Sequence, residues 1–272
     1  MLVTEGGETR GTLGGGCVEA EVRLRALRQL PADACRLLTF KLDDNYGWDD
    51  GLVCGGTMEV AVATLGGANA ANPYRRAREL VERGETATLH FGTFEQVIRP
   101  PPTLIIAGAG HVGEALATLA ASVDFDVVVV DDRPDCASEA RFPSARRIVG
   151  DIERELGRLR LTAASHVVIV TRGHRHDASA LRAVVNSAAR YIGLIGSKRK
   201  IIEIFKLLRA EGVPTEALTK VHAPIGLDLG GTTPGEIAVS IAAELVAVRR
   251  GGSAARDAMR IDHATLDRTL NR

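Results

Sequence analysis

Hydrophobic and polar positions along the second half of the chain form short apolar runs that alternate with longer amphipathic stretches. Leu104–Ala107 and Val127–Val130 are apolar runs of strand length, and the stretch between them has apolar residues at helical spacing. Strands are expected at 104–107, 127–130, 147–149, 166–170, 191–195 and 220–222, and helices near 112–121, 152–160, 177–189, 198–210 and 234–249. This alternation over residues 103–250 predicts an α/β fold with a Rossmann-like, doubly wound parallel sheet.

The first 66 residues have a different pattern, which predicts a smaller N-terminal β-rich domain. Its expected elements are strands at 1–4 and 9–13 joined by a turn, a helix at 18–30, and strands at 36–42 and 58–65. Residues 43–56 are acidic and glycine-rich, which indicates a loop. Residues 67–102 are expected to be a linker region with one helix at 74–83, one strand at 87–91 and a stiff proline spacer at 100–102, and residues 251–272 a tail.

The segment after the first α/β strand contains the pattern Gly-x-Gly-x-x-Gly at Gly108, Gly110 and Gly113. In a nucleotide-binding unit the first glycine permits a tight turn, the second lets the backbone approach a pyrophosphate, and the third lets helix and strand pack closely. The helix that follows offers unpaired N–H groups to the anion. Asp131 ends the next strand at the spacing expected for a carboxylate that binds a ribose hydroxyl, which favours an unphosphorylated ribose. The alternative is a parallel α/β turn without a ligand.

Loops that follow the strands of a doubly wound sheet form its ligand crevice, so their residues are candidates for binding. Besides the glycines and Asp131, the candidates are His111, Asp132, Arg133, Gly196, Ser197, Lys198 and His222. The basic residues 198–200 open a helix, where positive charge opposes the helix dipole, and an anionic ligand group would remove this conflict. Solvated side chains at 198–200 and a helix cap at Asp177 are the corresponding interpretations without a ligand.

The last expected helix has a well-defined start and an unusually apolar body. Thr233 is the expected N-cap, Pro234 lies at the first helical position and Glu236 completes a capping box. The sequence after Gly235 is apolar on nearly every side, which predicts burial at a subunit or domain contact. We therefore expect a homodimer, and the alternative is that the helix packs against the sheet of its own domain.

Two cysteines lie beside glycines in similar settings, Cys17 in GGGCVE and Cys54 in CGGTME. Cys17 is expected at the N-terminus of the helix that begins at Val18, where the thiolate is favoured as a nucleophile or ligand. The alternative is that both cysteines are small buried hydrophobic residues. No two cysteines form Cys-x-x-Cys, so neither a zinc ribbon nor a ferredoxin-type cluster is predicted.

Composition narrows the possible partners of the 272-residue chain, which has a formal net charge of zero and a pI near 7.1. No basic block is interleaved with aromatic residues, which argues against nucleic acid as a partner. No apolar run reaches membrane-spanning length, and the start lacks the pattern of a signal peptide. A cytoplasmic protein with reduced thiols and no membrane partner is therefore expected.

Six motifs in order along the chain resemble the XdhC/CoxI family, the accessory factors of xanthine dehydrogenase and carbon monoxide dehydrogenase. They are GGGCVEAEV, GLVCGGTMEV, LIIAGAGHVGEALA, VVVVDDRP followed by RFP, YIGLIGSKRK, and VHAPIGLDLGGTTPGEIAVSIAAELVAVR. The resemblance runs from Met1 to Arg250, and the family's small-domain cysteines match Cys17 and Cys54. The family pattern also includes a segment upstream of the strand matched by residues 1–4, so this small domain is expected to lack one sheet neighbour.

The resemblance implies a protein that binds the molybdenum cofactor (molybdopterin), protects it while its terminal sulfido ligand is installed, and helps insert it into a molybdenum hydroxylase. The implied partners are the apo-hydroxylase and a cysteine desulfurase, and the implied role is a maturation chaperone rather than a catalyst. An NAD(H)-dependent oxidoreductase is the alternative from another class, because the glycine pattern and Asp131 fit both. A nucleotide sensor or scaffold is a third hypothesis.

Overall fold

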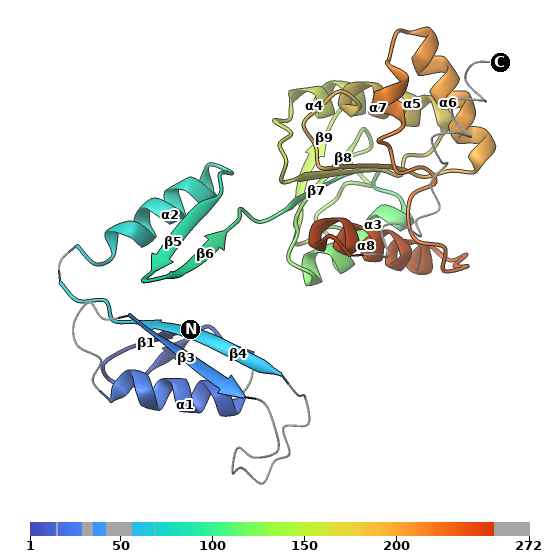
Figure 1. The fold of residues 1–272 in the computed structure, drawn as a ribbon. Coiled ribbons are helices and arrows are strands. Elements are labelled where there is room, and N and C mark those ends of the chain that lie inside the picture. Colours follow the sequence, from blue (N-terminus) through green and yellow to red (C-terminus); the bar gives the residue numbers. More distant parts are fainter. Residues whose placement is uncertain (15, 29–34, 42–55, 68, 253–272) are drawn as a thin grey trace. The chain divides into compact units, whose positions relative to one another are not determined.

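A computed structural model describes residues 1–14, 16–28, 35–41, 56–67 and 69–252, and Figure 1 labels the helices and strands. The chain divides into two compact units, residues 1–100 and 101–272, and each has hydrophobic clusters of its own. Nearly all of the expected loop at 43–56 and of the expected tail at 251–272 lies outside the described residues. Within the described ranges, no helix has the length and apolar content needed to cross a membrane.

The first part of unit 1 consists of two antiparallel strand pairs and one helix. Its elements are β1 (Leu2–Val3), β2 (Thr9–Arg10), α1 (Gly16–Leu27), β3 (Cys35–Lys41) and β4 (Thr57–Ala63). β1 pairs with β2 across the expected turn, and β3 pairs with β4. Val18 and Val22 of α1 pack with Phe40 and Val60 of the longer strands, and these side chains form a small core.

The stretch at 67–102, expected to be a linker region, contains a helix followed by a hairpin, and its residues up to Pro100 belong to unit 1. α2 (Asn72–Glu82) contacts β5 (Ala87–Phe91), and β6 (Phe94–Ile98) pairs with β5 in antiparallel register. The pattern of apolar residues does not predict β6, because four of its five residues are exposed and the strand has no buried face. The boundary between the units therefore lies at Pro100, well after residue 66.

Unit 2 is organised around one five-stranded parallel sheet, which confirms the predicted Rossmann-like α/β fold. Its strands are β7 (Thr103–Ala107), β8 (Asp126–Asp131), β9 (Arg146–Val149), β10 (Ser165–Ile169) and β11 (Tyr191–Leu194). They lie in the order β11-β10-β7-β8-β9, so the chain moves away from β7 first on one side and then on the other. At such a switch point the loops after neighbouring strands diverge and leave a crevice.

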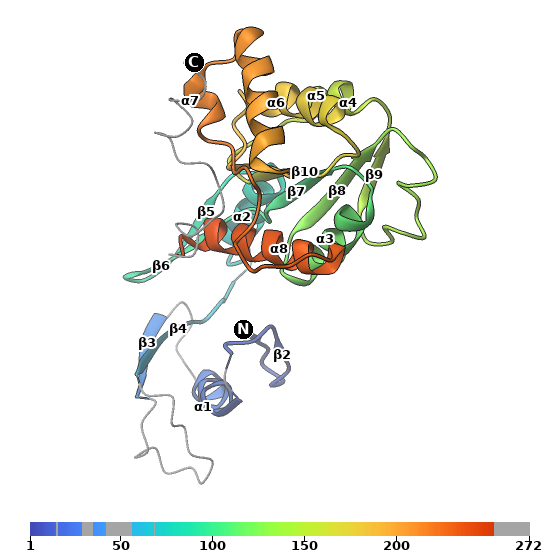
Figure 2. The same ribbon diagram turned by 90° about the vertical axis from the view of Figure 1, so that its right-hand side faces the viewer.

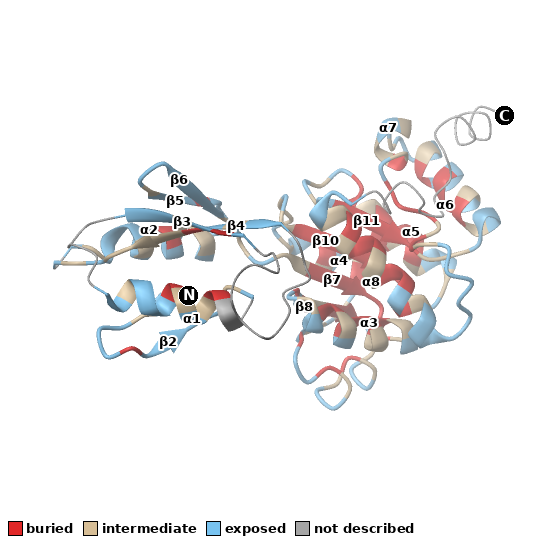
Figure 3. Ribbon diagram, turned by 60° about the horizontal axis from the view of Figure 1, so that its bottom comes forward, coloured by how far each residue is buried: buried red, intermediate tan, exposed pale blue. Residues whose placement is uncertain are grey.

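Helices cover both faces of this sheet (Figures 1 and 2). One face carries α4 (Ile152–Arg158), α5 (His174–Val184), α6 (Lys198–Ala210) and α7 (Thr215–Leu218), and the other carries α3 (His111–Ser122) and α8 (Pro234–Arg250). Figure 3 shows the strands of this sheet as largely buried. Side chains alternate between the two layers, so Ile105 belongs to one cluster and Leu104 and Ile106 to the other.

α8 confirms the predicted helix and its capping box, and it packs within unit 2. The Thr233 hydroxyl accepts from the Glu236 N–H at 3.3 Å, and the Glu236 carboxylate accepts from the Thr233 N–H at 2.9 Å. The helix lies against α3 and buries Ala238, Ile241 and Leu245. This is the alternative packing within one domain, and the homodimer stays a prediction.

Two elements differ from the expectation. α5 begins at His174 rather than near residue 177, because Gly173 is its N-cap. Asp177 is therefore not a cap but lies inside the first turn, where it is fully buried. The strand expected at 220–222 is a single parallel bridge between Gly193 and His222, so the sheet has five regular strands in the described part of the chain.

Candidate functional site

The turn between β7 and α3 is so tightly packed that two of its glycines have no room for a side chain. Gly108 has a φ of +119°, and a Cβ there would lie 2.5 Å from the carbonyl oxygen of Val170. A Cβ on Gly113 would lie 2.2 Å from the carbonyl oxygen of Gly108. Both distances are far shorter than van der Waals contact, so these glycines allow the turn and the close helix–strand packing that the pattern predicts.

Gly110, the middle glycine, faces open space. It is the N-cap of α3 with extended backbone angles, φ −77° and ψ −174°, and a Cβ there would meet no atom within 4 Å. No side chain caps this end of α3, and His111 at its first position is exposed. The first N–H groups of a helix have no partner inside the helix. The turn therefore leaves an open approach for an anionic group.

Asp131, the predicted ribose-binding carboxylate, is buried and has a full set of protein donors. Its Oδ2 accepts from the Ala109 N–H at 2.7 Å and from Arg133 Nη2 at 2.9 Å. Its Oδ1 accepts from the backbone N–H of Arg133 at 3.0 Å and from Arg133 Nε at 2.8 Å. These bonds fill the lone-pair positions of a carboxylate, so no position is left for a ribose hydroxyl while Arg133 stays bound.

Electrostatics supports this structural role for Asp131. Burial alone would raise the pKa of its carboxyl group, but the hydrogen bonds from Arg133 and Ala109 outweigh burial and lower the pKa to about 2. The carboxylate is therefore charged at neutral pH, and it ties the end of β8 to the glycine turn after β7.

Two further arginine–carboxylate pairs surround the glycine turn. Arg141 Nη1 donates to the Ala109 carbonyl at 2.8 Å, and its Nε donates to Glu114 of α3 at 3.0 Å. Arg172, in the loop after β10, makes a bidentate ion pair with Asp132, in the loop after β8, at 2.8 and 2.7 Å. The sequence did not reveal these roles, because the carboxylates lie 27 and 40 residues from their arginines.

The predicted basic group at the start of α6 is only partly solvated. Ser197 Oγ accepts from the Lys200 N–H at 3.3 Å and caps the helix. The Lys200 ammonium forms an ion pair with buried Asp177 of α5, which also accepts from the Thr171 hydroxyl at 2.5 Å. Lys198 is exposed, as the interpretation without a ligand expects.

A cavity of about 540 Å³ lies beside these residues, between the N-terminal ends of α5 and α6. Gly173, His174, Ser197, Arg199, Lys200, Glu203, Ile204 and Leu207 line it. Gly196 precedes it with a φ of +154°, and a Cβ there would lie 3.0 Å from the Lys200 side chain. A hollow lined by basic, acidic and apolar side chains thus lies beside the loops that follow β10 and β11.

His222 lies in the core between β11 and α8, where Glu244 holds it. Its Nδ1 donates to Glu244 Oε1 at 2.7 Å, while the Tyr191 hydroxyl and the Gly226 N–H donate to Oε2 at 2.5 and 2.8 Å. Burial raises the pKa of Glu244, but the hydrogen bonds from His222 and Tyr191 outweigh it and lower the pKa below its usual value. The network therefore holds the segment from His222 to Gly226 against α8.

The described residues do not test whether the two predicted cysteines lie close together. Cys54 lies outside them, and for Cys17 only the backbone is described, within the first turn of α1. The role expected for their thiols as ligands or nucleophiles therefore stays a prediction.

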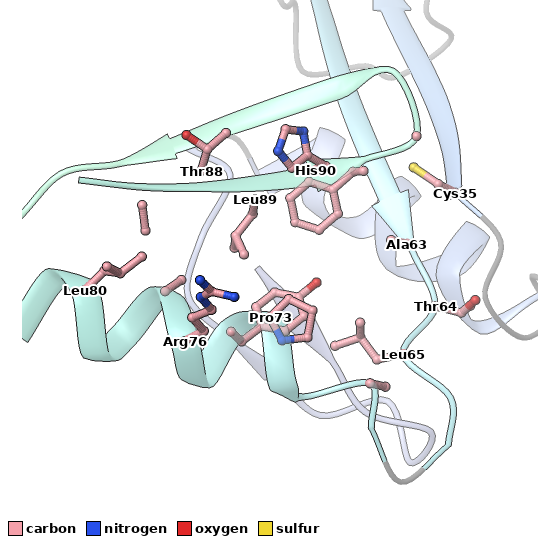
Figure 4. A pocket seen from close by; sticks show the side chains of 16 residues that line it. Cys35, Ala63, Thr64, Leu65, Pro73, Arg76, Leu80, Thr88, Leu89 and His90 are labelled. Atoms are coloured by element: carbon pink, nitrogen blue, oxygen red, sulfur yellow. The ribbon is translucent and has the colours of Figure 1, made fainter. Parts of the chain in front are cut away.

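Unit 1 contains a cavity of its own, with a volume of about 570 Å³ (Figure 4). Figure 4 shows Arg76 of α2 and His90 of β5 on two sides of it, with Cys35 of β3 at one end. Burial, followed by the nearby thiol of Cys35, raises the pKa of the Tyr74 hydroxyl that also lines the cavity. Cys35 is a free cysteine that sequence reasoning did not single out, because it lacks flanking glycines.

The strand order and the glycine turn define a Rossmann-type α/β domain, which a smaller α+β unit precedes in the sequence. The loops at the carboxyl ends of β7, β8 and β10 form the rim of this domain and contain Arg133 and Arg172. A family model described as the XdhC Rossmann domain matches residues 104–245, more than half of the chain, and one described as the XdhC and CoxI family matches residues 1–41. The chain belongs to the XdhC and CoxI family.

Three relatives each match 92% of this chain. Uncharacterized protein YqeB of Escherichia coli is 29% identical, but the match covers only 40% of its length. A probable xanthine dehydrogenase subunit of Bacillus subtilis is 27% identical over 87% of its length, and the molybdenum cofactor insertion chaperone PaoD of Escherichia coli is 23% identical over 77%. A crystal structure described as a xanthine dehydrogenase from Bacillus halodurans has the same fold, with a TM-score of 0.76 at 24% identity over 92% of this chain and 85% of that one.

Proposed function

We propose that this protein binds the molybdenum cofactor as cargo and delivers it to a molybdenum hydroxylase of the xanthine dehydrogenase type. Family membership supports the proposal, because one relative is named a molybdenum cofactor insertion chaperone and another a probable xanthine dehydrogenase subunit. The strongest support comes from the N-terminal end of α3, which is open at Gly110. The turn beside it has no room for a side chain at Gly108 or Gly113.

The residues of the crevice fit a phosphate-bearing cargo such as this cofactor. Gly108 and Gly113 keep the turn close to the strand and helix, and Gly110 leaves the backbone N–H groups of α3 accessible. Arg133 and Arg172 place guanidinium groups beside the same turn, each paired with a carboxylate. Backbone N–H groups and arginine side chains are the usual partners of phosphate oxygens in proteins.

The finer part of the proposal concerns sulfuration. Cys17 and Cys54 of unit 1 would hold the cargo while a cysteine desulfurase supplies the sulfur of the terminal sulfido ligand. The family resemblance of their glycine-rich motifs supports this role. In this role the two cysteines protect the bound cofactor, which is the task of a chaperone rather than of an enzyme.

An oxidoreductase that uses NAD(H) has less support from the crevice. The glycine turn suits either ligand, and Asp131 is the feature that favours a ribose of a nicotinamide dinucleotide. That carboxylate is buried under Arg133, with its lone pairs occupied.

A binding experiment tests the proposal on the full chain, purified from cells that make molybdenum cofactor and from cells that do not. We expect bound pterin, measured as its fluorescent oxidation product, and bound molybdenum only from the first cells. Gly110→Val should lower both at least tenfold, because valine tolerates the extended backbone there but fills the anion approach.

Gly157→Val is the matched control, since Gly157 is exposed in α4 and a Cβ there also meets no atom within 4 Å. This variant should retain the bound pterin. Cofactor-free wild-type protein from cofactor-producing cells, or full occupancy in Gly110→Val, would contradict the proposal.

A further inference from the structure

The carboxyl end of β7 is crossed by an ion pair that joins the loops of its two neighbours. β7 lies between β10 and β8, so the loops after these strands flank the glycine turn. Arg172 comes from the first loop and Asp132 from the second, and their side chains meet in a bidentate contact at 2.8 and 2.7 Å. A ligand that reaches from the turn towards the end of β8 must displace or share this contact.

The pair is built from groups that can exchange partners. The Arg172 side chain is 41% exposed and that of Asp132 is 33% exposed, so both can be solvated when separated. Exposed ion pairs of this kind contribute at most about 1 kcal/mol. A ligand phosphate can therefore compete successfully for the guanidinium, because a phosphate offers the same bidentate geometry with more charge.

Asp132 can accept further hydrogen bonds, whereas its neighbour Asp131 cannot. Each oxygen of Asp132 accepts one hydrogen bond from Arg172, so each keeps a second lone-pair position. Asp131 is 1% exposed and its positions are filled by Ala109 and Arg133. Of these two neighbouring carboxylates, Asp132 is thus the one that is able to accept a hydroxyl from a ligand.

We propose that the Arg172–Asp132 pair is a latch over the glycine turn, which a ligand carrying a diphosphate and a vicinal diol opens. The ligand's phosphate takes the guanidinium of Arg172, and the freed carboxylate of Asp132 accepts its hydroxyl groups. Ribosyl diphosphates have this chemistry. The inference rests on the proposed function, which places the cargo at the glycine turn. It adds that Arg172 and Asp132 select the dinucleotide form of a phosphate-bearing cargo.

Titration of the full-length protein with inorganic pyrophosphate and with ADP tests the latch, because only ADP carries the ribose. Asp132→Ala removes the competitor of the phosphate, so pyrophosphate should bind about threefold to fivefold tighter, which corresponds to an exposed pair of up to about 1 kcal/mol. The ratio of ADP affinity to pyrophosphate affinity should fall at least tenfold, since a charged hydrogen bond to the hydroxyls is lost. Arg172→Ala should weaken both ligands at least tenfold.

Asp135→Ala is the matched control, because it removes an exposed carboxylate from the same loop and should leave both affinities unchanged. Asp132→Asn gives a second, nearly isosteric test of the same competition. The latch is refuted if wild-type protein binds neither probe, if Asp132→Ala fails to tighten pyrophosphate binding, or if it strengthens both ligands equally. The amount of pterin that copurifies with wild-type protein is a separate readout, so failure of the latch is distinguishable from failure of the proposed function.

Discussion

Replacing Gly113 by alanine should destabilise unit 2 strongly, whereas the same change at Gly110 should not. A Cβ at position 113 would lie 2.2 Å from the carbonyl oxygen of Gly108, which is backbone. That backbone has little freedom to move, because the Ala109 N–H is bound to Asp131 and the Ala109 carbonyl to Arg141. Relief of the clash must therefore push α3 away from the sheet.

The expected magnitude follows from opposing effects. Overpacking of a tightly filled site costs typically 1–3 kcal/mol, and a clash with fixed backbone lies at about the upper end, roughly 3 kcal/mol. Alanine gains about 0.5–1 kcal/mol over glycine inside a helix. The net loss is about 2 kcal/mol, which corresponds to a decrease in Tm of about 4–8 °C for a domain of this size.

Far-ultraviolet circular dichroism of the full chain, with heat or urea, measures this loss. Gly110→Ala is the matched control, since its backbone is extended and its space is empty. It should lose at most about 1 kcal/mol, because alanine is a poorer N-cap residue than glycine. A Gly113→Ala protein with wild-type stability, or a Gly110→Ala protein as unstable as Gly113→Ala, would show that this description of the turn is wrong.

Two other buried groups in unit 2 give further predictions. Burial, with Arg190 and Arg249 nearby, lowers the pKa of His166 to about 4 from a usual 6.5, so the unfolded chain takes up the proton first. The contribution of His166 to stability should thus be constant above pH 6.5 and decrease by up to about 1.4 kcal/mol per pH unit as the pH falls towards 4. Urea midpoints of His166→Phe should lack this component. In Glu244→Gln an amide NH2 group replaces one of the two carboxylate oxygens that accept hydrogen bonds from His222, Tyr191 and Gly226. The free energy of unfolding measured with urea should therefore fall by about 2 kcal/mol or more. Glu216→Gln at an exposed site should cost nothing measurable.

The sheet was predictable because its strands and turns carry local signals. Ile105 and Ile106 lie in a run apolar on both faces, which only a covered parallel strand or a buried helix explains. Gly113 is required by its contact with Gly108, five residues earlier, and the capping box at Thr233 involves residues three apart. Such features depend on near neighbours in the sequence, so the pattern contains them.

The chemistry of the rim was less predictable because it depends on partners from distant segments. Asp131 has the spacing of a ribose ligand, but Arg133 folds back onto it and Ala109 approaches from 22 residues away. His222 has the appearance of a loop histidine until α8 brings Glu244 to it across 22 residues. Only the packed structure decides which acidic residues are saturated and which, like Asp132, have lone pairs to offer.

Transfer of cofactor to a hydroxylase tests the central claim most directly. Wild-type protein loaded with cofactor in cells is mixed with a cofactor-free molybdenum hydroxylase of the xanthine dehydrogenase type, and the recovered activity is plotted against the pterin supplied. We expect activity to rise in proportion to the pterin carried by wild type and by Gly157→Val, and to stay near background with Gly110→Val. Equal recovery with Gly110→Val, or no recovery from protein that demonstrably carries pterin, would contradict the role of this crevice in cofactor delivery.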